Sequence, residues 1–245
     1  MVPHWFSVLS FAELALGALC ALIVLVDVVR HPQHMAIMNV VWPVTALFGT
    51  GLTLWLYFSY GRLATHDAMR SAMARDEKPP SKSQTPFWAM VAKGASHCGA
   101  GCTLGDIVSE WLCFLVPAVA VALGWGSLFG EKMYAVWIAD FLVAYAFGVA
   151  FQYFAIRPMR DDVSRGQAIW LAIKADTLSL TSWQIGMYGF MAFASFYLFD
   201  GVFGAKLRVD SAPFWFMMQI AMLCGFATAY PTNWWLIRSG IKEKM

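Results

Sequence analysis

Six long apolar segments constrain the fold of this chain more than any other feature. Each is long enough to cross about 30 Å of hydrocarbon as an α-helix, which takes about 20 residues. Charged residues make up only 13% of the 245 residues, whereas a soluble domain carries about 25%. We therefore predict an all-α fold, in which one polytopic transmembrane domain over residues 1–245 forms a six-helix bundle in the lipid bilayer. The predicted spans are 5–29, 36–60, 97–124, 133–156, 168–199 and 212–237.

The distribution of Lys and Arg predicts how the bundle sits in the membrane. In a six-span topology the connections 61–96 and 157–167 lie on the same side as the C-terminal end. Together they hold most of the basic residues, Arg160 and Lys244 among them. Because basic loops stay in the cytoplasm, we expect both termini and a polar loop at about 61–96 to be cytoplasmic. The net charge of +2 is too small to indicate nucleic-acid binding.

The third apolar segment opens with an unusual motif, SHCGAGCTLGD at residues 96–106. Cys98, Cys102, Asp106 and Glu110 follow one another at intervals of four residues, so on a helix they form one stripe. The stripe would run about 18 Å along the helix axis. Thiols and carboxylates on one face are typical of a soft-metal site or a proton pathway.

The two cysteines are the strongest candidates for metal ligands. Two thiolates one turn apart bind soft metals such as Cu(I), and His97 would add a third ligand. A thiol–disulfide redox pair is a second interpretation. The third is plain packing, because Gly99, Ala100 and Gly101 also suit the close approach of another helix.

Acidic residues inside apolar segments indicate function by default, because each costs about 2.5–3.5 kcal/mol on insertion scales. Asp106 and Glu110 therefore predict a polar or proton route. The fifth segment offers a complementary polar face, on which Lys174 would pair with Asp106 or Asp176. The other members of that face are Thr177, Thr181, Gln184 and Tyr188. For Asp140, alone on the fourth segment, we predict only a hydrogen bond within the bundle.

Four separated segments carry a resemblance to a known family. They are MNVVWPVTAL (38–47), SHCGAGCTLGD (96–106), KADTLSLT (174–181) and NWWLIR (233–238). In this order they resemble the bacterial membrane proteins grouped as the DUF4396 family, over nearly all of the chain. The resemblance implies an integral protein of the bacterial inner membrane. The function of that family is unknown, so it implies no catalytic residue.

The favoured functional hypothesis is binding and transport of a transition-metal ion by His97, Cys98 and Cys102, with Cu(I) as the favoured ion. Asp106, Glu110, Lys174 and Asp176 would keep the route polar or relay protons. The alternatives are an accessory subunit of a membrane redox or photosynthetic complex, a thiol–disulfide oxidoreductase, and a proton-coupled channel without metal. An enzymatic activity is the less favoured reading. Partners would be the metal ion and either a membrane complex or further copies of the chain.

Overall fold

The structure is a computed structural model that describes residues 2–157 and 164–243. Over these residues the chain is helical and has no strands, which confirms the all-α prediction. Arg160 and Lys244, which entered the prediction of orientation, lie outside the described residues. In chain order the elements are α1 (His4–Arg30), α2 (Met38–Leu56), η1 (Tyr57–Gly61), η2 (Arg62–Ala64), α3 (His66–Ala74), α4 (Pro80–Ser83), α5 (Phe87–Leu115), α6 (Pro117–Ala122), α7 (Lys132–Ile156), α8 (Arg165–Ala192), η4 (Phe193–Val202) and α9 (Ala212–Arg238).

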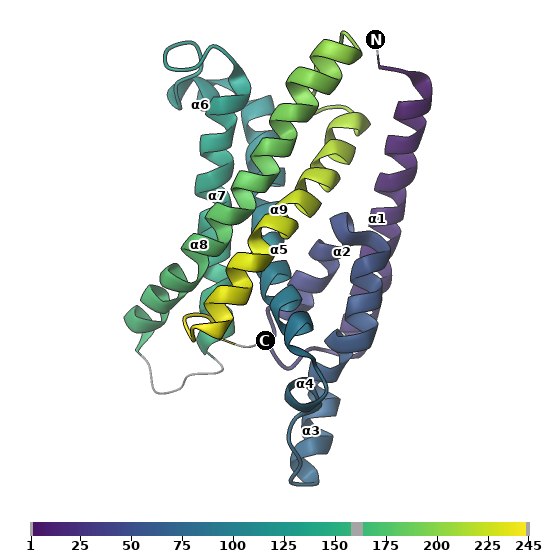
Figure 1. The fold of residues 1–245 in the computed structure, drawn as a ribbon, viewed down its shortest axis with the longest axis vertical. Helices are drawn as coiled ribbons and strands as arrows, with labels where there is room; N and C mark the ends of the chain where they lie inside the picture. The colour runs from purple at the N-terminus through teal and green to yellow at the C-terminus, as the bar shows by residue number, and fades with distance from the viewer. Residues whose placement is uncertain (1, 158–163, 244–245) are drawn as a thin grey trace.

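Six helical segments are long and apolar enough to cross a membrane, so the chain is a polytopic membrane protein as predicted. These segments are α1, α2 continued to Ala64, α5, α7, α8 continued through η4, and α9. In Figure 1 they form an elongated bundle, from which α3 and α4 project at one end. We call this the basic end, and we call the opposite end, which carries α6, the pocket end.

The third predicted span differs in its boundaries from the helix that forms. α5 begins at Phe87, well before residue 97, and ends at Leu115 instead of reaching residue 124. Pro117 explains the end, because a proline disfavours the helical conformation of the residue before it, and Val116 has φ −125° and ψ 78°. The predicted polar loop at 61–96 is correspondingly shorter. The cysteines therefore lie in the middle of a helix and not near its start.

The second apolar segment bends sharply back on itself at Thr50. Thr50 has φ 40° and ψ −122°, a conformation that interrupts the helix between Gly49 and Gly51. The Thr53 hydroxyl donates to the carbonyl oxygen of Thr45 at 3.3 Å. In a straight helix these residues would be about 12 Å apart along the axis. The two halves of the segment therefore lie against each other as a helical hairpin.

Both ends of this hairpin lie at the basic end of the bundle. A straight helix from residue 38 to residue 64 would separate its ends by about 40 Å. Instead, the His34 amide donates to the carbonyl of Ala64 at 2.8 Å, and the His66 amide donates to that of Pro32 at 2.9 Å. The hairpin thus enters and leaves on the same side.

The fold-back changes the predicted placement of the termini. Near the N-terminus, Phe6 contacts the rings of Phe199 and Phe203 at the pocket end. α9 starts close to that point and runs 27 residues to the basic end. Figure 1 accordingly has the N-terminus at the top and the C-terminus in the lower half. The two termini therefore lie at opposite ends of the bundle, because only five of the six apolar segments run from one end to the other. The side of the membrane on which each terminus lies stays a prediction.

α5 is the central helix and packs against α2, α7, α8 and α9. Small residues let α7 approach it very closely. A Cβ added at Gly105 would lie 2.5 Å from the Cα of Ala144, and one added at Gly101 would lie 3.1 Å from the Cα of Gly148. Close backbone contact of this kind is how small residues hold membrane helices together.

Candidate functional site

A row of titratable side chains lies buried along the middle of α5. Cys98, Cys102 and Asp106 are fully buried, and only 5% of Glu110 is exposed. The surrounding helices bring further acids alongside this row, Asp176 from α8 and Asp140 from α7, with exposures of 0% and 1%. The stripe predicted from the spacing therefore faces the interior of the bundle and not lipid.

The inner part of the row lies toward the basic end, where a lysine from the C-terminal tail enters the bundle. Lys242 is 2% exposed, and its amino group donates to the carbonyl of Gly94 (3.2 Å) and to Oδ1 of Asn233 (2.7 Å). It lies within electrostatic range of both His97 and Asp176. Lys242 is therefore one cation that faces the buried groups of this end.

The predicted pairing of Lys174 with Asp106 or Asp176 is wrong. Lys174 is exposed on the outer side of α8, while Asp176 on the same helix is fully buried. Two positions apart on a helix differ in direction by about 200°, so the two side chains point opposite ways.

The remaining polar residues of α8 differ in their roles. The hydroxyls of Thr177 and Thr181 donate to carbonyls of their own helix at 2.6 and 2.7 Å, so they do not extend the polar row. Gln184, by contrast, is buried and lies beside Asp106.

The centre of the row contains buried acids that form no ion pair with the described residues. Within the described residues, neither carboxyl oxygen of Asp106, Asp140 or Asp176 is hydrogen-bonded with good geometry. Asp140 lies within electrostatic range of Asp106 and Glu110, so three acids from two helices share one region. We predicted a hydrogen bond within the bundle for Asp140, and the structure places its carboxyl group beside Ser109 of α5 as well as in this cluster.

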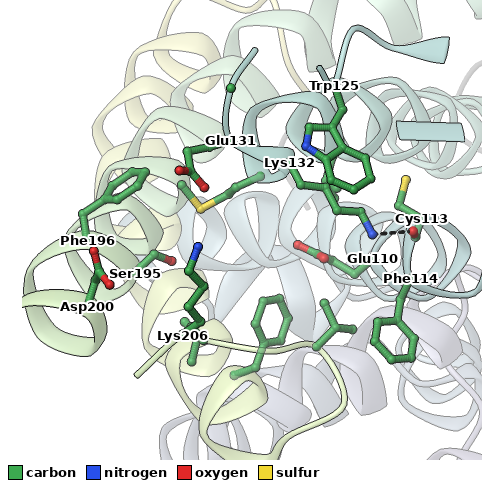
Figure 2. A pocket seen from close by; sticks show the side chains of 16 residues that line it. Glu110, Cys113, Phe114, Trp125, Glu131, Lys132, Ser195, Phe196, Asp200 and Lys206 are labelled. Atoms are coloured by element: carbon green, nitrogen blue, oxygen red, sulfur yellow. Dashed lines mark hydrogen bonds between the residues drawn. The ribbon is translucent and has the colours of Figure 1, made fainter. Parts of the chain in front are cut away.

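The outer part of the row opens into a pocket of about 430 Å³ at the pocket end. Glu110 lies on its wall, together with Lys132, whose amino group donates to the carbonyl of Cys113 at 2.7 Å. Figure 2 shows Glu110 pointing into the pocket from one side and Lys206 from the other. Trp125 lies under the amino group of Lys132, 5.4 Å from the ring centroid.

The loop that carries Lys206 is held in place by an ion pair. Arg208 donates two hydrogen bonds to Asp210, at 2.9 and 2.7 Å. The guanidinium holds the pKa of Asp210 below its ordinary value, so the pair persists at neutral pH. The indole of Trp215 also donates to the carbonyl of Val209 at 2.8 Å. Lys206 therefore projects from a loop with defined contacts.

The predicted metal ligands are only partly assembled. The thiols of Cys98 and Cys102 lie beside each other, and Asp176 lies beside Cys98. The ring of His97 contacts Phe151 on α7, with centroids 5.9 Å apart, and neither of its nitrogens is hydrogen-bonded in the described part of the chain. Among the described residues, no group of three or more His, Cys, Asp or Glu side chains is arranged to hold a metal ion.

The glycines of the motif serve helix packing. A Cβ on Gly99 would collide with the ring of Trp183 on α8, and Gly101 lies against α7 as described above. The packing interpretation is thus confirmed for Gly99 and Gly101. It says nothing about the role of the thiols of Cys98 and Cys102.

Comparison with known proteins agrees with the resemblance drawn from the motifs. Residues 87–242, from the start of α5 to the tail that carries Lys242, match the family described as "Domain of unknown function (DUF4396)". No curated protein and no solved structure matches the chain. The matched region contains all the buried groups discussed here, and it covers well over half of the chain. This polytopic membrane protein therefore belongs to the DUF4396 family.

Proposed function

We propose that this protein moves protons across the membrane, as the proton-coupled core of a transport protein, along the buried acids of α5, α7 and α8. One observation carries the proposal: Asp106, Asp140 and Asp176 are fully or almost fully buried and form no ion pair with the described residues, in a row whose outermost member, Glu110, reaches a pocket. An unpaired ionised carboxyl costs several kcal/mol in such surroundings. Groups of this kind are stable when they hold a proton, and they can pass it on.

The spacing of the row would let a proton pass from one titratable side chain to the next. Successive members on α5 are four residues, or about 6 Å, apart along the axis. Asp140 and Asp176 lie beside this series and shorten the remaining gaps. Lys242 stands at the basic end, and Glu110 opens toward the pocket end. Chains of Asp, Glu and His are the usual proton relays of membrane pumps and transporters.

Proton flux into proteoliposomes tests this proposal. The full chain is reconstituted with a pH-sensitive dye inside the vesicles, and an inward pH gradient is applied with valinomycin and K⁺ to clamp the potential. We expect faster acidification than in protein-free vesicles, and a loss of at least about tenfold in Asp106→Asn and Asp140→Asn, because each removes one titratable link.

Glu77→Gln is the matched control, because Glu77 is exposed and forms an ion pair with Arg75 at the basic end, far from the buried row. It should conduct like the wild type. Flux equal to that of empty vesicles, or undiminished flux in both aspartate variants, would reject the proposal. The family resemblance favours the bacterial inner membrane as the location, where a proton gradient is available.

Cu(I) binding remains a second candidate, supported by the adjacent thiols of Cys98 and Cys102. Thiolates select soft metals, and His97 directly precedes Cys98 in the sequence. Competition for Cu(I) against a coloured chelator tests it under reducing conditions. We expect one ion per chain in the wild type and in Cys224→Ser, and none in the double variant Cys98→Ser/Cys102→Ser. Equal Cu(I) uptake by all three proteins would remove this candidate.

A further inference from the structure

The pocket at the outer end of the row contains opposite charges that do not pair with each other. Glu110, Glu131 and Asp200 contribute carboxylates, and Lys132 and Lys206 contribute amino groups. Within the described residues, no ion pair joins any of these five side chains. Lys132 instead donates to the carbonyl of Cys113. The charge of Lys206 is thus available to a ligand.

The charges are also separated in space. Figure 2 shows the Lys206 amino group and the Glu110 carboxylate entering the pocket from opposite sides, with Ser195 next to Lys206. Glu110 is 95% buried, and Lys132 lies within electrostatic range of it, but the Lys132 amino group donates its hydrogen bond to the carbonyl of Cys113. A buried carboxylate without a direct ion pair is costly. A ligand that carries both a positive and a negative group would satisfy both sides together.

The size and the walls of the pocket narrow the ligand class. Its volume of about 430 Å³ falls in the range of sites for small organic molecules. Aromatic side chains form much of the wall: Phe114, Trp125, Phe196 and Phe214. An inorganic ion would leave these surfaces unused, whereas an apolar side chain would bury them.

Widened helical turns contribute one side of the pocket. η4 continues α8 with turns of π-helical type, and it supplies Ser195, Phe196 and Asp200. Such turns are rare and occur often at functional sites. On the opposite side, α5 supplies Glu110, the last acid of the buried row. The pocket therefore joins that row directly.

We propose that this pocket binds a small zwitterionic α-amino acid with an apolar side chain, its carboxylate held by Lys206 and its ammonium by Glu110. One part of this inference rests on the proposed function, namely that the amino acid is the solute whose transport is coupled to protons. Binding itself stands on the pocket alone.

Calorimetric titration of the full chain in detergent tests the proposal with three ligands of one shape. L-Phenylalanine carries both charges, phenethylamine only the ammonium, and 3-phenylpropanoate only the carboxylate. We expect L-phenylalanine to bind at least about tenfold more tightly than either analogue, since each analogue lacks one charge-assisted contact. Equal affinity of the three ligands, or no binding of L-phenylalanine, would overturn the proposal.

Two variants assign the contacts. Lys206→Met should weaken L-phenylalanine binding about tenfold or more and leave phenethylamine unaffected. Glu110→Gln should weaken L-phenylalanine binding and leave 3-phenylpropanoate unaffected. Lys82→Met, at the exposed basic end, is the control and should bind like the wild type. Unchanged affinity in both pocket variants refutes the assignment. Proton flux that persists without amino-acid binding would reject this inference alone, and binding without proton flux would reject the proposed function alone.

Discussion

The bend at Thr50 makes a quantitative prediction about stability. A β-branched residue at φ 40°, ψ −122° occupies a region in which side chains other than glycine cost about 1–3 kcal/mol. Replacing Thr50 with glycine removes that cost, while the greater freedom of glycine in the unfolded chain returns about 0.5–1 kcal/mol. Thr50→Gly should therefore stabilise the protein by about 0.5–2 kcal/mol.

The matched control is Leu52→Gly, two residues further along in the regular part of α2. Leu52 is 70% exposed, so the change removes little internal packing. Glycine inside a helix costs about 1 kcal/mol, and this variant should be destabilised by that amount. Denaturant titration in mild detergent, monitored by circular dichroism, measures the free energy of unfolding of both variants. If Thr50→Gly loses as much stability as Leu52→Gly, the segment is a continuous helix and the hairpin is refuted.

Three further predictions follow from the same fold. Reporter tags should place the two termini on opposite sides of the membrane. The C-terminus should be cytoplasmic, because the basic loops lie on its side. Two tags on the same side would contradict the fold-back of the second segment. Gly105→Ala should impair folding, because its Cβ would lie 2.5 Å from the Cα of Ala144. Gly166→Ala is the control and should fold normally, because the space around Gly166 is open. Equal yields of the two folded variants on size-exclusion chromatography would contradict the close helix crossing. Lys242→Met should lower the free energy of unfolding by about 1–3 kcal/mol, since it leaves the side-chain oxygen Oδ1 of Asn233 buried without its donor. A loss no larger than that of the exposed control Lys82→Met would show that the tail is not docked.

Hydropathy predicted the helical membrane fold but not the path of the second segment. Residues 36–60 form a continuous apolar stretch, and its length alone is that of a span. The bend depends on a single residue between two glycines, and on contacts such as that of Asp27 with Arg62 and Tyr57. Such contacts join residues about 30 positions apart, which helical periodicity does not reveal.

The candidate site was predictable where it followed one helix. Four-residue spacing placed Cys98, Cys102, Asp106 and Glu110 on a common stripe, and the structure buries all four. Spacing within one segment does not say which neighbouring helix supplies the partners. The lysine near Asp176 is therefore Lys242 from the C-terminal tail, and not Lys174 from α8. No periodic signal marks a lysine that lies beyond the last helix.

Infrared spectroscopy of the buried carboxyl groups tests the central claim most directly. If the acids of the row hold protons and exchange them with water, the wild type has a C=O stretch of protonated carboxyl groups that shifts when H₂O is replaced by D₂O. That band should lose intensity in Asp106→Asn and in Asp140→Asn and remain unchanged in Glu77→Gln. A wild-type spectrum without this band, or a band that ignores both aspartate substitutions or never exchanges with solvent, would contradict a proton pathway through the bundle.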